Sequence, residues 1–257
     1  MATYVGVDWA GKGWFGAARH DDGSWRCDLY PSVHSIWYAH SDATSILIDI
    51  PIGLPAASGH RRRCDERAKQ LLGPRQRSVF YAPVREAVYE TNLTVAKEVN
   101  EAAGYSIQNQ AWSAVPRIRE VDEFLDANPG ARDRWRETHP EVCYRALKGA
   151  PLETSPSDAG ALREREQVLL DRHPDLEAPL AAAIETVTTP RFAPLVGDRT
   201  PILGAFVAAL TASRDPSNRS TLPESPPTDD RGLPMGIVYP SDVQQLTLAD
   251  LDGAGSL

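Results

Sequence analysis

Two short apolar runs of this 257-residue chain each end in an aspartate. Residues 4–7 lead to Asp8, and residues 46–48 lead to Asp49. Their β-branched content predicts two buried strands, each with a carboxylate where the strand leaves the core. If the strands are parallel neighbours, the two carboxylates meet at one sheet edge, where they repel each other unless a divalent cation binds them. The pattern favours a metal site; the alternative for either aspartate alone is the start of an ordinary turn.

The cysteines and histidines indicate no other kind of metal site. Cys27, Cys64 and Cys143 are far apart in the chain, and the six histidines show no ligand spacing. This argues against a disulfide framework and against structural zinc. Oxygen ligands favour Mg²⁺ or Mn²⁺, so one of these two ions is the expected cofactor.

The composition is that of an ordinary globular protein, with 42% hydrophobic and 24% charged residues. The net charge of -8 repels nucleic acid and gives no support to nonspecific binding. No apolar stretch approaches the roughly 20 residues that span a bilayer, and no signal-like segment precedes the first predicted strand. We therefore expect a cytoplasmic protein without membrane contact; the sequence does not indicate its oligomeric state.

The elements that position the two aspartates form an α/β pattern. A short helix at 31–40 precedes the strand at 45–49, so this fourth strand is expected to run parallel to the first. The three strands before that helix read as a meander at 3–8, 14–18 and 25–30.

Farther along the chain, we predict a fifth strand around 135–138, a last one at 236–240, and a Pro- and Ser-rich loop at 215–231. Helices are predicted at about 63–72, 91–103, 110–127 and 202–213. We expect residues 1–240 to form one domain with a helical insertion around 85–130, followed by a polar tail at 241–257.

Six strings in sequence resemble the family called domain of unknown function 429, described as predicted nucleases of the RNase H-like fold. They are Gly6-Val7-Asp8 with Lys12-Gly13-Trp14, Ile48-Asp49-Ile50-Pro51-Ile52-Gly53-Leu54-Pro55, Arg63-Cys64-Asp65 with Leu72-Gly73, Ser78-Val79-Phe80 with Ala82-Pro83, Glu137-Thr138-His139-Pro140-Glu141-Val142, and Ala208-Ala209-Leu210-Thr211-Ala212. The resemblance implies a mixed five-stranded sheet, in which three antiparallel strands are followed by two that alternate with helices. It also implies an acidic site where strands one and four adjoin.

The same resemblance implies a divalent-metal-dependent nuclease in which Asp8 and Asp49 hold Mg²⁺ or Mn²⁺. Glu137, at the end of the predicted fifth strand, is expected to complete the metal site. His139 or Glu141 would then carry a proton or support the ligands. The alternative is that residues 139–141 are simply a helix start, where Pro and Glu are favoured for local reasons.

A basic segment follows the second aspartate. Between His60 and Arg77 the chain has seven basic residues and two acidic ones. Because arginine suits bidentate contact with phosphate, this segment is a candidate substrate-binding surface; the alternative is a solvated helix. The expected phosphate contacts are Lys12, Arg63, Arg67, Arg75 and Arg77.

The last helix departs from the pattern that the resemblance implies. Thr200, Pro201 and Gly204 stand where acids are expected. Glycine within a helix costs up to about 1 kcal/mol relative to alanine, so Gly204 suits close packing rather than helix stability. Asp198, in the preceding loop, could supply the missing metal ligand instead.

This departure leaves two other functions open. The first is a noncatalytic nucleic-acid- or protein-binding protein on the same fold. The second is a phosphotransferase or hydrolase that acts on a small phosphorylated molecule. For the nuclease itself, the sequence does not distinguish DNA, RNA and hybrid substrates.

Overall fold

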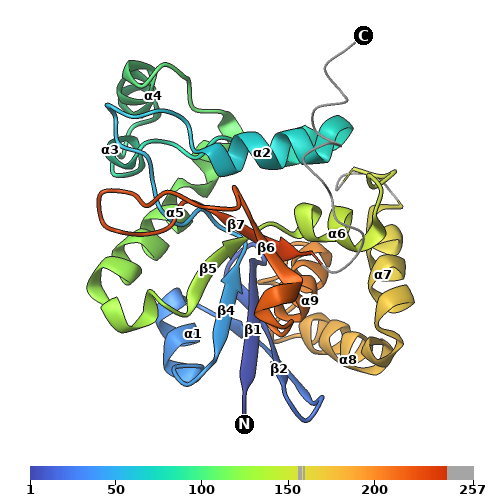
Figure 1. Cartoon of the computed structure of the whole chain (residues 1–257). Helices are drawn as coiled ribbons and strands as arrows, with labels where there is room; N and C mark the ends of the chain where they lie inside the picture. The colour runs from blue at the N-terminus through green and yellow to red at the C-terminus, as the bar shows by residue number, and fades with distance from the viewer. Residues whose placement is uncertain (156–157, 159, 242–257) are drawn as a thin grey trace.

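The computed structural model describes residues 1–155, 158 and 160–241 (Figure 1). The predicted polar tail therefore lies, apart from its first residue, outside the described residues. The described chain is a mixed α/β structure built on one sheet in the order β3-β2-β1-β4-β5-β7-β6. The strands are β1 (Thr3–Trp9), β2 (Trp14–His20), β3 (Trp25–Tyr30), β4 (Ser45–Ile48), β5 (Trp135–Thr138), β6 (Arg219–Leu222) and β7 (Ile237–Pro240).

The strand directions explain why the carboxylates meet. β1, β4, β5 and β7 run parallel to their neighbours in this series, so their carboxyl ends lie at one edge. β2 and β3 continue the sheet antiparallel beyond β1. The predicted meander and the parallel pairing of the first and fourth strands are thus confirmed.

The prediction of five strands is wrong, because the sheet has seven. β7 continues the parallel series beside β5, and β6 pairs antiparallel with β7 at the outer edge. The four residues of β6 fall within the segment at 215–231 that composition marked as a loop. These residues form a strand by pairing with β7, which is separated from them by the long connection at 223–236. A four-residue strand next to such a connection could not be recognised from composition.

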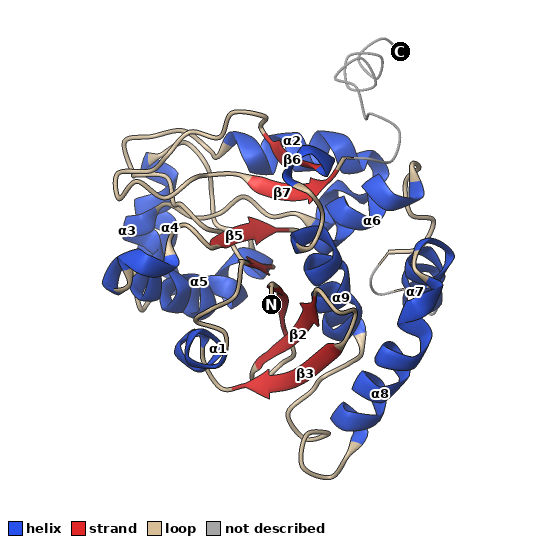
Figure 2. Ribbon diagram, turned by 60° about the horizontal axis from the view of Figure 1, so that its bottom comes forward, coloured by secondary structure: helices blue, strands red, loops and turns tan. Residues whose placement is uncertain are grey.

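Helices cover both faces of the sheet (Figure 2). α1 and α5 share one buried cluster with β1 and β4, whereas α6, α7, α8 and α9 pack in another on the opposite face. α3, α4 and α5 occupy the connection between β4 and β5. The helices are α1 (Val33–Ala39), α2 (Arg63–Leu72), α3 (Arg85–Val88), α4 (Leu93–Ala102), α5 (Asn109–Ala127), α6 (Pro140–Lys148), α7 (Ala161–Arg172), α8 (Glu177–Thr188) and α9 (Thr200–Ala212), with a 3₁₀ helix η1 (Gly73–Ser78) after α2.

α9 lies unusually close to β1. A Cβ atom on Gly6 would come within 2.0 Å of the Ala205 carbonyl oxygen and 2.3 Å of the Ala209 nitrogen. Only glycine permits this contact, since real Cβ atoms do not approach backbone so closely. The close approach brings the first turns of α9 against the end of β1, where Asp8 lies. None of the helices in the described part of the chain is long and apolar enough to cross a membrane.

Candidate functional site

Asp8 and Asp49 lie side by side at the carboxyl edge of the sheet. Val7 is paired with Ile48, so each aspartate follows directly after a matched pair on strands about 4.8 Å apart. The Asp49 amide donates to the Val7 carbonyl at 2.9 Å, which extends the parallel ladder by one residue. The Asp8 carboxylate accepts a 2.6 Å bond from the Trp9 amide. The two acids that were singled out from the sequence are therefore neighbours.

The two carboxylates have no cationic partner within the described part of the chain. Among the described residues, no ion pair reaches either of them. Burial raises the pKa of Asp8 well above its ordinary value, and the charges of Asp49 and Asp198 raise it further. Burial also raises the pKa of Asp49, an effect that His139 opposes and Glu141 reinforces. A bound cation would remove this electrostatic cost.

A cavity of about 280 Å³ opens over the two acids. The sheet edge contributes Asp8 and Asp49, and the connection between β4 and β5 supplies the facing wall through α5. Gln110, Ser113 and Arg117 line that wall at spacings of three and four residues, so they lie on one helix face. The cavity therefore combines two unpaired carboxylates with polar and cationic side chains.

Arg117 is the cationic residue of the α5 wall, and sequence reasoning missed it. Its guanidinium lies 4.7 Å from the ring centre of Trp9, and its one hydrogen bond within the described chain goes to the Ser113 carbonyl. Burial lowers the pKa of Arg117, and Glu120 opposes this shift; arginine nevertheless stays protonated. The polar spacing of Gln110, Ser113 and Arg117 was a usable signal, but nothing in the sequence connected that helix face to Asp8.

Glu137 lines the cavity but is held by Arg62. It is paired with Ile48, which is in turn paired with Val7, so its side chain points to the opposite face from those of Asp8 and Asp49. The Arg62 guanidinium donates to both Glu137 carboxylate oxygens, at 2.7 and 2.8 Å. The Ile52 amide donates to one of them at 2.8 Å. In this arrangement Glu137 has an internal cation and does not complete a site with the two aspartates.

Arg62 has no donor left for a ligand. Besides Glu137, it donates to both carboxylate oxygens of Asp65 and to the carbonyls of Ile52 and Gly53. It is 2% exposed, and Asp65 is 1% exposed. Its role is to fix the start of α2 and the loop after Asp49 against β5.

His139 and Glu141 separate at the start of α6. Pro140 is the first helical residue and His139 the cap, as the helix-start interpretation expects. His139 lines the cavity; its Nε2 lies 3.3 Å from the Ser78 carbonyl, and its buried Nδ1 has no partner in the described structure. Glu141 instead binds Arg165 through two 2.7 Å bonds, which ties α6 to α7.

Gly204 and Asp198 lie on the α9 side of the site. A Cβ atom on Gly204 would be 1.9 Å from Asp8 Oδ2, so the Asp8 carboxylate occupies the space of that side chain. This agrees with the expectation that Gly204 serves close packing. Asp198 is exposed and accepts a 2.6 Å bond from the Thr200 amide at the start of α9. Its charge reaches Asp8, but it is not among the residues that line the cavity.

The five predicted phosphate contacts fall in different places. Lys12 does not line the cavity, and Arg63 and Arg67 belong to the outer side of α2, where Arg67 donates to Gln70. Arg75 and Arg77 line a hollow beside the cavity. The basic segment is thus split between a solvated helix face and a surface next to the acids.

The donor set fits one hydrated divalent cation. Within the described residues, no group of three His, Cys, Asp or Glu side chains is arranged to hold a metal. Mg²⁺ keeps several water ligands and is commonly bound through one or two carboxylates. Asp8 and Asp49 meet that requirement, whereas Glu137 is bound to Arg62.

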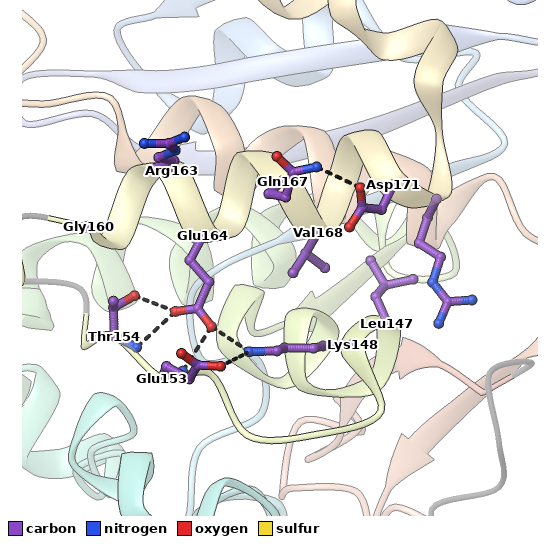
Figure 3. A pocket seen from close by; sticks show the side chains of 11 residues that line it. Leu147, Lys148, Glu153, Thr154, Gly160, Arg163, Glu164, Gln167, Val168 and Asp171 are labelled. Atoms are coloured by element: carbon purple, nitrogen blue, oxygen red, sulfur yellow. Dashed lines mark hydrogen bonds and ion pairs between the residues drawn. The ribbon is translucent and has the colours of Figure 1, made fainter.

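Another hollow of about 480 Å³ lies between α6 and α7, away from the acids (Figure 3). Glu164 is its most perturbed group. Although burial opposes it, hydrogen bonds from Lys148 and Thr154 lower the pKa of Glu164 to about 2. The Glu153 and Thr154 amides also donate to this carboxylate, at 2.8 Å each. These polar groups satisfy one another's hydrogen bonds, and their role is to hold α7 against the end of α6.

The raised pKa values predict that metal-free protein loses stability as the pH rises. Below the ordinary value of 3.8, each aspartate is protonated in both states. Above it, the unfolded chain loses its protons first, so the folded state becomes less stable until its own raised pKa values are passed. With EDTA at pH 7, Asp8→Asn is expected to melt a few degrees above wild type, since ~1 kcal/mol shifts Tm by ~2–4 °C at this size. Calorimetric scans at pH 4 and 7 test this, and a difference of the same size at both would contradict it.

The model of one protein family matches residues 6–228, a span that includes both aspartates and α9. The family is described as "Protein of unknown function (DUF429)". No curated protein and no solved structure matches the chain.

Proposed function

The chain belongs to the DUF429 family of proteins of unknown function, and we propose that it is a divalent-metal-dependent phosphodiester hydrolase on an RNase H-like fold. The observation that carries this proposal is the pair Asp8 and Asp49, adjacent and without a cation, on the wall of a cavity that also contains Arg117. The strand order β3-β2-β1-β4-β5 supports the fold assignment. β7 and β6 would then be additions beyond the core sheet.

The residues of the cavity suit phosphate chemistry. Asp8 and Asp49 would hold one Mg²⁺ or Mn²⁺, which when bound polarises a phosphoryl oxygen and lowers the pKa of bound water. Arg117 presents its guanidinium from the opposite wall, where it can neutralise a phosphate oxygen. His139, whose Nδ1 is unpartnered in the described structure, is close enough to influence Asp49 and can accept or donate a proton.

We also propose a cytoplasmic location. All three cysteines lie in the described chain as free thiols, and two of them, Cys64 and Cys143, are buried. Free thiols are typical of reducing compartments, whereas secreted proteins usually pair them.

One observation favours the noncatalytic alternative. Glu137 is neutralised by Arg62, and Gly204 provides no carboxylate, so the site has two acids where the family resemblance implies more. On this alternative the cavity would bind a phosphate-containing ligand or a metal without turnover. Binding and hydrolysis must therefore be measured separately.

Calorimetric titration with Mn²⁺ tests the metal site. We expect millimolar or tighter binding of one ion per wild-type chain, with loss of binding in Asp8→Asn/Asp49→Asn. Asp171→Asn is a matched control, because Asp171 is an exposed carboxylate on α7 far along the chain from both ligands. No Mn²⁺ binding by the wild type would overturn the proposal.

Hydrolysis of bis(p-nitrophenyl) phosphate and of labelled oligonucleotides tests the reaction. We expect cleavage that requires Mn²⁺ or Mg²⁺ and falls by about 10² or more in Asp8→Asn, the size typical of lost acid–base or metal-site groups. Metal binding without cleavage would select the noncatalytic alternative. Cleavage that persists in EDTA would contradict a metal-dependent reaction.

A further inference from the structure

The cavity over the acids continues into a groove along η1. It shares Ser78 and Gln110 with a second hollow of about 660 Å³, which Arg75 and Arg77 also line. The second hollow shares Arg77 and Gln110 with a third, of about 650 Å³. We use "η1 groove" for the second and third hollows together, whose residues are Lys69, Pro74, Arg75, Gln76, Arg77, Ser78, Tyr81, Gln108, Gln110 and Ser155.

The η1 groove is basic in a protein whose net charge is -8. Its described lining includes Lys69, Arg75 and Arg77 and no aspartate or glutamate. None of these three cations forms an ion pair within the described chain. Arg75 donates its Nε hydrogen to the Leu152 carbonyl at 3.0 Å, and its two terminal nitrogens form no other hydrogen bond within the described chain. Lys69 is already engaged, because its Nζ donates to the carbonyls of Gln76 and Val79. Arg75 and Arg77 are therefore the cations of the groove that are available to a polyanion.

Aromatic rings accompany these cations. Tyr81 lines the third hollow, with Lys69 Nζ at 4.9 Å and the Arg61 guanidinium at 4.4 Å from its ring centre. Phe80 and Trp9 line the cavity itself. A positive groove with interspersed aromatic rings is the arrangement by which proteins bind single-stranded nucleic acid, since phosphates contact the cations and bases stack on the rings.

The size of the cavity restricts the form of the substrate. Its 280 Å³ lie between the sheet edge and α5, so a phosphate that reaches Asp8 and Asp49 must enter a partly open cavity beneath that helix. The phosphates of a duplex lie on a stiff helix that bends only at an energetic cost, so bringing one of them into a cavity beneath α5 is unfavourable. A single strand meets this requirement without that cost.

We propose that the η1 groove binds single-stranded nucleic acid, with one nucleotide in the acidic cavity and the neighbouring phosphates on Arg75 and Arg77. This inference rests on the proposed function, because it assigns the substrate of the same site. It also divides the basic segment: Arg75 and Arg77 bind substrate, and Arg63 and Arg67 do not.

Fluorescence anisotropy in EDTA tests the groove without metal binding or cleavage. The probes are a labelled 12-nucleotide oligo-dT and the same strand in a duplex. We expect the single strand to bind at least tenfold more tightly than the duplex. Arg75→Ala/Arg77→Ala should weaken its binding at least tenfold and reduce the salt dependence, whose slope is about 0.7 for each phosphate contact of a single strand. Arg63→Ala/Arg67→Ala removes the same charge from the same segment and should change affinity less than twofold.

Three results would overturn the inference: equal affinity for the duplex, equal losses in the two double variants, or binding of dTMP that is not improved in the oligonucleotide. The last would assign the cavity to small phosphate esters. Failure of the proposed function gives a different result, because single-strand binding in EDTA would persist while Mn²⁺ titration and hydrolysis assays show nothing. Melting temperatures of both double variants confirm that each is folded.

Discussion

Replacing Arg62 with methionine is expected to destabilise the protein by about 3–5 kcal/mol, the usual cost of removing one partner from a buried ionic group. The guanidinium is bound to Glu137 and Asp65, and all three side chains are at most 5% exposed. Without it, two carboxylates would remain buried together, and the carbonyls of Ile52 and Gly53 would lose a donor. Urea unfolding at pH 7 measures the change.

Two further variants separate charge from geometry. Arg62→Lys keeps the charge but cannot reproduce the paired bonds to both carboxylates, so an intermediate loss is expected. Arg62→Met/Glu137→Gln removes the Glu137 charge together with the arginine, so it should be more stable than Arg62→Met. A loss below about 1 kcal/mol in Arg62→Met would show that Glu137 and Asp65 find other partners or become protonated at little cost.

The single variant Arg62→Met is also expected to bind Mn²⁺ at a new place. Arg62 occupies the space between Glu137 and Asp65 as a fixed organic cation. Its removal should let Mn²⁺ raise the melting temperature of Arg62→Met more than that of wild type, since a ligand stabilises the state that it binds. If Mn²⁺ raises the melting temperature of both proteins equally, Glu137 and Asp65 do not bind the metal, and Asp8 and Asp49 alone account for its binding.

The acidic pair could be predicted from the sequence because it depends on local patterns. A strand is recognised from its own residues, and a helical crossover fixes the direction of the next strand. Those two rules suffice to bring Asp8 and Asp49 to one sheet edge. The described structure has this arrangement.

The remaining site residues depend on register and long-range partners, which local patterns do not specify. Glu137 was recognised as the end of a strand, but a shift of one residue decides which face it meets. Its partner Arg62 is 75 residues away in the chain and belongs to the basic segment that the sequence marked as a candidate substrate-binding surface. Arg117 likewise reaches the cavity only because α5 folds back over the sheet edge.

Gly204→Asp provides the sharpest test of what α9 contributes. The family resemblance suggests that an acid there would complete the metal site and raise activity. The geometry predicts the opposite: a Cβ atom would be 1.9 Å from Asp8 Oδ2 and 3.2 Å from Pro140 Cγ. Overpacking costs about 1–3 kcal/mol and sometimes more, and a third carboxylate adds repulsion to two aspartates whose pKa values burial already raises. We expect a loss of about 3 kcal/mol or more and weaker Mn²⁺ binding.

Gly204→Ala is the matched control, because it introduces the same Cβ atom without the charge. The difference between the two variants in urea unfolding therefore measures the cost of the carboxylate group, its bulk and its charge together. Asp8→Gly/Gly204→Asp moves the carboxylate from the strand to the helix and removes the collision, so it should be more stable than Gly204→Asp. If Gly204→Asp instead unfolds like wild type and hydrolyses phosphodiesters faster, α9 can move away from β1, and the two-carboxylate site is an incomplete form of a larger one. If it loses both stability and Mn²⁺ binding, the contact between Gly204 and Asp8 is itself a condition for holding the metal.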